Sequence, residues 1–377
     1  MNHKTSSLQC IIPPHMLEEI AKSGTTRQQQ KARQSLAQAA AIRSQRLAIP
    51  RGVQIDQSSE MHRVVYDARN GTSLPGQQAR AEGAPATGDA AVDEAYDGAG
   101  ATYRLFKEIY ERNSIDGSGL WIKSTVHYYN SYDNAFWNGQ QMVYGDGDED
   151  LPVAERLFNR FTIAIDVIGH ELTHGVTQYE AQLTYANQPG ALNESMSDVF
   201  GALVKQRTLN HTAAQADWII GQGLFTANIN GVGIRSMKAP GTAYDDPVLG
   251  KDPQPAHMND YKNVDYDNGG VHINSGIPNH AFYATAKELG GFAWEKAGRI
   301  WYVTLASKLS SSSDFQQAAN LTFQVAGELY GANSLEQQAV RNGWAAVGIT
   351  VAATGGGGGG TGCLLAPLGL FGFLFKR

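Results

Sequence analysis

The sequence of 377 residues contains only two cysteines, Cys10 and Cys363, which lie near opposite ends of the chain. Small secreted scaffolds that depend on disulfides need several cysteine pairs, so no disulfide framework is predicted here. The cysteine count also does not reveal the redox compartment. The composition, with 42% hydrophobic and 18% charged residues, is typical of a globular protein and excludes extended disorder. The length predicts two or three domains.

The chain also lacks any long run of lysine or arginine, and its net charge is −6. A basic patch is therefore not expected, and we predict no binding to nucleic acid. The charge is unevenly distributed, because residues 1–50 contain seven Lys/Arg and two Asp/Glu, a balance of +5, which leaves −11 for the remainder. Two interpretations are open. The basic segment docks against the acidic body, or it is a basic disordered arm.

No long hydrophobic run opens the chain, since residues 1–9 are polar and only Cys10, Ile11 and Ile12 precede a Pro-Pro pair. This pattern predicts no N-terminal signal peptide. Near the other end, the six glycines Gly355–Gly360 predict a flexible linker, and the apolar segment Cys363–Phe375 that follows would reach only about 20 Å as a helix. The order of glycine, apolar and basic residues is similar to bacterial surface-sorting tails, although a disordered apolar terminus is the alternative. We expect a secreted or cell-surface protein that contacts a membrane only through this tail.

The most informative segment is His170-Glu171-Leu172-Thr173-His174, an H-E-x-x-H signature. Residues at i and i+4 share one face of an α-helix, so both imidazoles can bind one zinc ion. Glu171 can hold a water molecule on that zinc, which lowers the pKa of the water towards about 7. A match to so short a motif can arise by chance, and a surface helix with two histidines is the alternative.

A second helical pattern, Ala191–Val204, follows a predicted loop at residues 187–190 and supplies a third ligand. Glu194 and Asp198 are spaced i, i+4, so a carboxylate from this helix can reach a zinc ion on the first helix. Asp198 can accept a hydrogen bond from the second nitrogen of one ligand imidazole, and Asn193 can do the same for the other. The alternative is that these are ordinary acids on a helix surface.

HELTHGVTQYEAQLTY, followed by GALNESMSDVFGALV, closely resembles the thermolysin family of neutral zinc metalloproteases. Three further segments resemble the family: 134–147 its substrate-edge strand, 234–237 its substrate-arginine segment, and 267–276 its active-site histidine loop. The resemblance runs from about Tyr66 to about Gly348. Residues 1–52, with their Pro-Pro motif, resemble the short propeptide of the protealysin-like branch.

This resemblance implies that His170, His174 and Glu194 bind one Zn2+ and that Glu171 is the general base. Peptide hydrolysis also needs donors where negative charge develops. The remaining roles implied by the family are oxyanion stabilisation by Tyr185 and His272, orientation of His272 by Asp267, binding of the substrate main chain by Asn134, Ala135 and Arg235, and an apolar pocket for the residue after the cut formed by Phe158, Phe161, Val167 and Ile234.

The resemblance also implies a departure from the family at its usual double calcium site. Two acids remain, Asp166 and Asp217, but Lys205 stands where the family has a shared glutamate, and Ile219 and Gln222 replace two further acids. Calcium needs six to eight oxygen ligands, several of them anionic. We therefore expect no calcium at this site, with the Lys205 ammonium between the two aspartates instead.

The expected fold class is α+β, with two lobes: a β-rich N-terminal lobe and a helical C-terminal lobe, with the zinc helix between them. The expected domains are an inhibitory propeptide at 1–52, the N-terminal lobe ending in the zinc helix at 53–178, the C-terminal lobe at 179–353, and the linker and tail at 354–377. Periodicity predicts the following elements: strands at 62–67 and 123–129, an irregular loop at 70–92, and helices at 16–46, 95–112, 161–178, 277–289, 293–309, 314–329 and 334–347.

The function expected from these features is a zinc endopeptidase made as a latent precursor, whose partners are peptide or protein substrates and its own propeptide. Two alternatives are an inactive binding protein on the same fold and an envelope-tethered structural protein, the latter suggested only by the tail. Cys10 has two interpretations as well. Its thiolate caps the zinc in the precursor, or it is simply a buried or exposed thiol.

Overall fold

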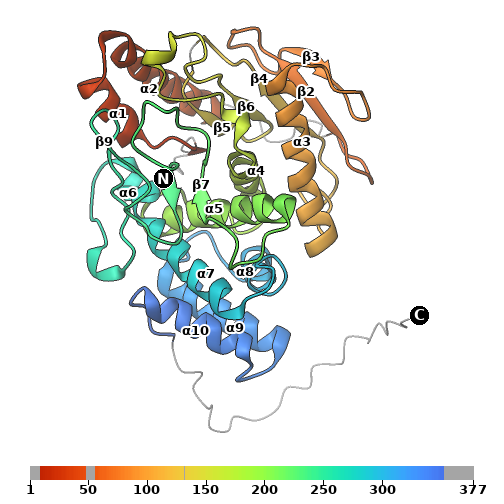
Figure 1. Cartoon of the computed structure of the whole chain (residues 1–377). Helices are drawn as coiled ribbons and strands as arrows, with labels where there is room; N and C mark the ends of the chain where they lie inside the picture. Colours follow the sequence, from red (N-terminus) through yellow and green to blue (C-terminus); the bar gives the residue numbers. More distant parts are fainter. Residues whose placement is uncertain (1–8, 48–55, 131, 352–377) are drawn as a thin grey trace.

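The computed structural model describes residues 9–47, 56–130 and 132–351, and Figure 1 shows two lobes with helices α4 and α5 between them. The expected boundary of the propeptide near residue 52 and the tail at 354–377 lie outside the described residues. The N-terminal lobe carries a mixed sheet and the C-terminal lobe is helical, as the sequence predicted. None of the helices in the described part of the chain is both long and apolar enough to span a membrane.

The sheet of the N-terminal lobe has the strand order β1-β5-β6-β4-β2-β3 among the described residues. Strand β2 pairs in parallel with β4, and β4 with β6, whereas β1, β5 and β3 pair antiparallel to their neighbours. The strands are β1 (Gln9–Cys10), β2 (Arg63–Asp67), β3 (Gln77–Arg80), β4 (Ile122–Val126), β5 (Ala135–Trp137) and β6 (Met142–Tyr144). Because β1 comes from the expected propeptide, this segment completes the edge of the sheet beside β5.

The helices follow the apolar spacing of the sequence, and several begin at side-chain caps such as Asp89 before α3 and Asp314 before α9. The helices of the N-terminal half are α1 (Pro14–Ser23), α2 (Thr26–Leu47), α3 (Ala90–Arg104), α4 (Ile165–Tyr179) and α5 (Asn187–Leu209). Those of the C-terminal half are α6 (Asp267–Asn274), α7 (Gly276–Leu289), α8 (Ala297–Ser307), α9 (Phe315–Tyr330) and α10 (Leu335–Ala346). Short helical turns occur at Leu105–Ile109, Val153–Glu155, Phe161–Ile163 and Met258–Asp260.

The segment between α5 and α6 is rich in turns and forms two short antiparallel ribbons. These are β7 (Ile219–Ile220) with β8 (Arg235–Ser236), and β9 (Asp245–Asp246) with β10 (Gly250–Lys251). The ribbon that contains β9 lies beside α1 (Figure 1), and Arg235 of β8 contacts Ile11. This arrangement brings the turn-rich segment and the N-terminal segment to the same side of the molecule.

Several predicted elements differ from the structure. The helices expected from 161 and from 293 begin at Ile165 and Ala297. The helix expected at 16–46 is two helices, because it breaks at Gly24, where a Cβ atom would lie 2.8 Å from the Ile20 carbonyl. The helix expected from 95 begins at Ala90, because the cap at Asp89 was missed. The loop expected at 70–92 contains β3. The loop expected at 187–190 is the first turn of α5, a position that tolerates proline because its N–H groups have no helical partner.

Candidate active site

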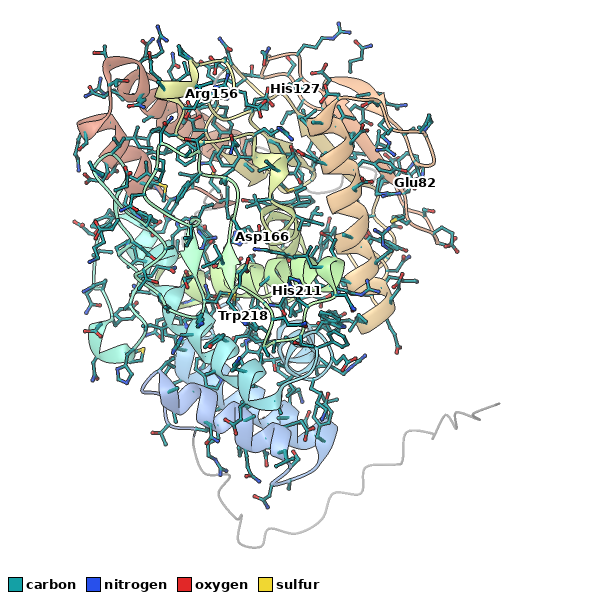
Figure 2. The ribbon with its side chains drawn as sticks, in the orientation of Figure 1. Glu82, His127, Arg156, Asp166, His211 and Trp218 are labelled. Atoms are coloured by element: carbon teal, nitrogen blue, oxygen red, sulfur yellow. The ribbon has the colours of Figure 1, made fainter. Side chains whose placement is uncertain are left out.

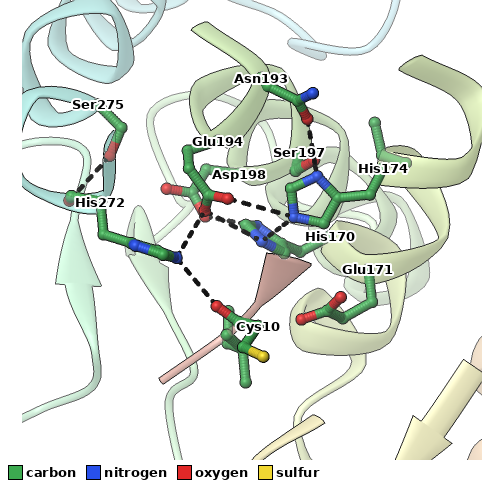
Figure 3. A network of polar contacts seen from close by, with 12 residues as sticks. Cys10, His170, Glu171, His174, Asn193, Glu194, Ser197, Asp198, His272 and Ser275 are labelled. Carbon is green, nitrogen blue, oxygen red and sulfur yellow. Dashed lines mark hydrogen bonds and ion pairs between the residues drawn. The ribbon is translucent and has the colours of Figure 1, made fainter. Parts of the chain in front are cut away.

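Three buried side chains from two packed helices converge between the lobes. Helix α4 presents His170 and His174, and α5 presents Glu194. One ligand atom from each residue lies within 4.8 Å of the others, and the two Nε2 atoms are 3.0 Å apart. All three residues are fully buried. Figure 3 shows both rings and the carboxylate facing one another.

The other ring nitrogens are held by neighbouring side chains, which fixes the direction of each ring. The His170 Nδ1 atom lies 2.8 Å from Asp198 Oδ1, and the His174 Nδ1 atom lies 2.8 Å from Asn193 Oδ1 and 2.9 Å from Ser197 Oγ. The two Nε2 atoms therefore point into the shared space. The sequence analysis did not predict a role for Ser197, although it lies one helical turn after Asn193 on the same face.

Asp198 is itself held by two further residues. Arg235 donates to both of its oxygens, at 2.8 and 2.7 Å, and Asn279 donates to Oδ2 at 2.7 Å. Burial alone would raise the pKa of Asp198, but Arg235 and His170 outweigh it and hold this pKa well below its usual range. Asp198 is thus an anion that anchors a ring on α4. Asn279 lies on α7, and no local pattern in the sequence pointed to it.

This donor set fits a catalytic zinc ion. Two imidazole nitrogens and one carboxylate are a common catalytic set, which leaves a further position open. The Glu194 Oε2 atom is buried and accepts no hydrogen bond from the described residues. A buried carboxylate oxygen without such a partner is costly, and a bound cation would satisfy it.

Glu171 lies on α4 directly after the first histidine and is fully buried. Its Oε2 atom accepts a hydrogen bond of 3.0 Å from the backbone N–H of Trp137 in β5. The carboxylate therefore bridges α4 and the edge of the sheet. Figure 3 shows it on the same side of the histidine pair as Cys10 of β1.

His272 and Tyr185 face the three candidate metal ligands from the C-terminal lobe. The His272 Nε2 atom lies 3.2 Å from the Tyr185 hydroxyl, which donates to Glu194 Oε1. The His272 Nδ1 atom lies 2.6 Å from Asp267 Oδ1. Burial favours the neutral ring, but Asp267 and Glu194 outweigh it and raise the pKa of His272 to about 9. Burial, together with Glu194, also raises the pKa of Tyr185 well above its usual value.

The backbone turns tightly just before His272. The residues belong to the short helix α6, which kinks at 268–270, where all three residues have positive φ. At Gly269, with φ of +84°, a Cβ atom would lie 2.2 Å from Asn187 Oδ1. The kink lets Asp267 reach both the ring and the backbone N–H of His272, the latter at 2.9 Å.

A segment of this same chain, residues 9–12, lies beside His170, His174 and Glu194. Gln9 and Cys10 pair antiparallel with Trp137 and Phe136 of β5. Beyond them, Ile11 donates its N–H to the Ala135 carbonyl at 3.2 Å, and Arg235 Nη1 donates to the Ile11 carbonyl at 3.3 Å. Asn134 accepts from the N–H of Ile12 at 3.0 Å and donates to its carbonyl at 3.3 Å. Three predicted substrate-binding residues thus contact the main chain of residues 11–12.

Comparison with known proteins then identifies the family. The model described as "Thermolysin metallopeptidase, catalytic domain" matches residues 51–178, and the one described as "Thermolysin metallopeptidase, alpha-helical domain" matches residues 181–349. The chain belongs to the thermolysin family of metallopeptidases. It is therefore a zinc-dependent metalloendopeptidase at the level of the family, on the two-lobed α+β fold.

Relatives within the thermolysin family are closely similar. The "Extracellular metalloprotease" of Pectobacterium carotovorum is 50% identical over 92% of this chain and 98% of its own length. The "Protease PrtS" of a Photorhabdus strain is 46% identical over 93% of this chain and 95% of its own. The precursor of protealysin, a metalloproteinase from Serratia proteamaculans, is 52% identical, with a TM-score of 0.82 over 91% of this chain and all of that one. These matches place the chain in the protealysin-like branch of the thermolysin family.

In this thermolysin-family site, the backbone carbonyl of Cys10, rather than its thiol, faces His272. The Cys10 carbonyl lies 3.0 Å from His272 Nε2, and Figure 3 shows the sulfur on the opposite side of the residue. The Cys10 side chain belongs to an apolar cluster with Tyr132 and Phe136. This position is that of a small buried hydrophobic residue. It gives no support to a thiolate that caps the metal.

The four residues expected to form the apolar pocket of a thermolysin-family protease all lie in the protein interior. Phe158, Phe161, Val167 and Ile234 are each at most 1% exposed. They share one core cluster with Ile11 of the N-terminal segment. The two phenylalanine rings lie 6.0 Å apart between centroids, so they pack against each other within this cluster.

At the position of the usual calcium site of the thermolysin family, the structure has a salt bridge. Lys205 Nζ lies 2.8 Å from Asp217 Oδ2 and 3.3 Å from Asp166 Oδ2, and it donates to the Ile219 carbonyl at 3.0 Å. Burial raises the pKa of Asp166, and Lys205 opposes this shift. Figure 2 shows Asp166 near the junction of α4 and α5. The Lys205 ammonium therefore stands between two acids that would otherwise face each other.

Proposed function

We propose that this chain is the latent precursor of a zinc endopeptidase in which His170, His174 and Glu194 hold the metal and residues 1–52 are the inhibitory propeptide. The observation that carries the proposal is the path of residues 9–12, which lie along β5 as an extended substrate would. The Cys10 carbonyl lies beside His272. The mature protein then comprises the two lobes, at 53–178 and 179–353, followed by the tail.

The catalytic roles follow from the geometry of these residues. Zn2+ bound to the three ligands would polarise the carbonyl of the substrate and lower the pKa of a water molecule. Glu171 accepts the proton of the attacking water and passes it to the leaving nitrogen. His272 and Tyr185 donate hydrogen bonds to the oxygen on which negative charge develops. Asp267 keeps the His272 ring protonated at Nδ1 and oriented.

The substrate is held in an extended form by Asn134, Ala135 and Arg235, through the contacts that they make with Ile11 and Ile12. Arg235 has a second role, because its guanidinium also donates to Asp198, which holds the ring of His170. In this frame the peptide bond between Cys10 and Ile11 lies at the catalytic centre, and Ile11 corresponds to the residue after the cut.

We expect the mature enzyme to prefer a large apolar residue immediately after the cut bond. Phe158, Phe161, Val167 and Ile234 are all apolar, and burying a side chain of the size of leucine is worth about 1.5–3 kcal/mol. This corresponds to roughly a 10- to 150-fold preference in kcat/KM over alanine at that position. Cleavage of a peptide library measures the preference directly. A preference for charged residues there would contradict the pocket assignment.

The docking of the propeptide is expected to depend on pH through His15, at the start of α1. Burial lowers the pKa of His15 to about 4, with Asp267 opposing this shift and His272 and Arg235 adding to it. Its Nδ1 atom is buried and accepts no hydrogen bond from the described residues. The ring is therefore neutral when docked, and protonation favours release.

The sign of the effect follows from the two pKa values. The free ring has a pKa near 6.5, so the docked state loses stability as the pH falls from 6.5 towards 4. Between pH 7 and pH 5 the docking equilibrium should weaken by about 20-fold.

The measurement is the rate at which a trace of active enzyme cleaves Glu171→Gln precursor, compared with the same precursor carrying His15→Gln. The ratio of the two cleavage rates at each pH cancels the pH dependence of the enzyme that cleaves them. An unchanged ratio between pH 7 and pH 5 would rule out His15 as the titrating group.

A single experiment separates this function from an inactive binding protein and from an envelope-tethered structural protein. Hydrolysis of casein is measured before and after removal of residues 1–52, with and without a zinc chelator. We expect activity to rise on removal and to disappear with the chelator. A secreted or cell-surface location is proposed, because the relative from Pectobacterium is named an extracellular metalloprotease.

A further inference from the structure

Lys31, in the second turn of α2, is buried against the N-terminal lobe, where it meets three carboxylates. Its ammonium lies 2.6 Å from Asp148 Oδ1, 3.1 Å from Asp150 Oδ1 and 3.8 Å from Asp133 Oδ1, and it donates to the Gly147 carbonyl at 3.1 Å. We call these four acceptor residues the Lys31 pocket. All four belong to the expected catalytic lobe, whereas Lys31 belongs to the expected propeptide. Release of the propeptide would therefore take the cation away and leave the acids behind.

The pocket is built by contacts that do not involve Lys31. Asp148 Oδ2 accepts from the backbone N–H groups of Leu157 and Phe158, at 2.8 and 3.0 Å, which leaves Oδ1 directed at the ammonium. Gly147 donates its N–H to the Tyr132 carbonyl at 3.3 Å, and its φ of +62° turns its own carbonyl towards Lys31. These oxygens are thus placed by the backbone of the N-terminal lobe.

Asp133 supplies an independent sign that the pocket needs a cation. The residue is only 3% exposed, and its Oδ1 atom, the one nearest to Lys31, accepts no hydrogen bond from the described residues. Burial raises the pKa of Asp133 well above its usual range, Asp148 adds to this shift, and Lys31 opposes it. Without a positive charge in the pocket, the buried carboxylates of Asp133 and Asp148 would repel each other and destabilise the folded protein.

We propose that the Lys31 pocket is a calcium site, which Lys31 fills in the precursor and Ca2+ fills once the propeptide has left. Every donor in the pocket is a carboxylate or carbonyl oxygen, the ligand type that calcium prefers, and water can complete the coordination. Three of the distances from the Lys31 ammonium, at 3.1–3.8 Å, exceed the calcium–oxygen distance of about 2.3–2.6 Å, because an ammonium occupies the centre. A divalent ion would draw the oxygens inward, which the half-exposed Asp150 can follow.

This site is separate from the position of Lys205, where the lysine is part of the catalytic body and stays after processing. The inference rests on the proposed removal of residues 1–52. Its test does not, because substitution of Lys31 in the full-length chain empties the pocket without any cleavage. Failure of calcium binding and failure of peptidase activity are therefore distinguishable results.

The experiment uses the full-length, zinc-loaded chain with Glu171→Gln, so that it stays intact, and compares Lys31 with Lys31→Ala. Calcium chloride is titrated calorimetrically, with magnesium chloride as a second probe. We expect Lys31→Ala to bind one Ca2+ at least 10-fold more tightly than Mg2+, and the chain with Lys31 not to bind it. The melting temperature should rise with calcium only in Lys31→Ala. Lys22→Ala, which removes an exposed lysine of α1 paired only with Glu19 in the described structure, is the matched control and should behave like the parent.

Two further substitutions assign the binding to this pocket. Asp133→Asn and Asp150→Asn, each in the Lys31→Ala chain, should weaken calcium binding by at least 10-fold. They are chosen over Asp148, whose carboxylate also holds two backbone N–H groups. If Lys31→Ala does not fold, the same titration is made on the wild-type enzyme after its propeptide has been removed. Absence of calcium binding in the chain that folds, or binding that both asparagine substitutions leave unchanged, would overturn the proposal.

Discussion

Replacing Glu171 with glutamine should abolish peptide hydrolysis while leaving zinc bound. The substitution removes the group that takes the proton from water, whereas His170, His174 and Glu194 keep the metal. General-base catalysis contributes about 10²–10⁴-fold, so kcat/KM should fall by at least that factor. The hydrogen bond from the Trp137 N–H to this side chain can be retained by the amide oxygen, so the fold should not change. Metal analysis of the purified variant, alongside casein hydrolysis, measures both expectations.

The same variant also tests self-processing. If the mature enzyme removes its own propeptide, purified Glu171→Gln precursor should remain full length, and a trace of active enzyme should cleave it. Clean processing of the inactive chain by itself would show that self-cleavage is not required. Near-normal turnover would contradict the role assigned to this glutamate, and loss of zinc would mean that the residue supports the metal site. Glu180→Gln, at the end of the same helix and only partly buried, is the matched control and should keep its activity.

The three candidate zinc ligands could be predicted because they lie in short sequence motifs. Two histidines spaced i, i+4 share a helix face whatever the fold, and the same rule joins Glu194 to Asp198 on the next helix. The crossing of these two helices came from the resemblance to the family rather than from periodicity. Asn279 was missed because it reaches Asp198 from a helix 81 positions later in the sequence. No spacing rule relates residues so far apart.

Errors in the predicted fold have a similar origin. The helix break at Gly24 and the early start of α3 depend on single residues at helix ends, where periodicity carries little information. The placement of β1 in the sheet is a tertiary event, since two residues of an otherwise separate segment pair with β5. The charge split between residues 1–50 and the remainder predicted docking as one of two possibilities. It did not predict that Lys31 would be enclosed by three aspartates.

Lys205 forms ion pairs with Asp166 and Asp217, and we expect their loss to destabilise the fold. Asp166 is 1% exposed, and its pKa is raised by burial and lowered by Lys205. Removing one partner of a buried ion pair costs about 3–5 kcal/mol, because a charge is left uncompensated. We expect Lys205→Ala to lower the free energy of unfolding by about this amount. Lys123→Ala, which breaks an exposed pair with Asp56, should cost less than about 1 kcal/mol.

We therefore expect the melting temperature of the full-length chain to be independent of calcium, because Lys205 provides the positive charge that a metal would otherwise supply. A calcium-selective chelator that leaves zinc in place should not change this melting temperature.

Lys205→Glu restores the shared acid of the family, so three carboxylates would then surround the position of the ammonium. That variant should be stable only with calcium and should lose many degrees on chelation. The precursor is the right form for this comparison, because Lys31 fills the other acidic pocket in it. A large fall in the melting temperature of the wild-type precursor on chelation, or calcium bound beside Asp166, would show that the lysine does not replace the metal.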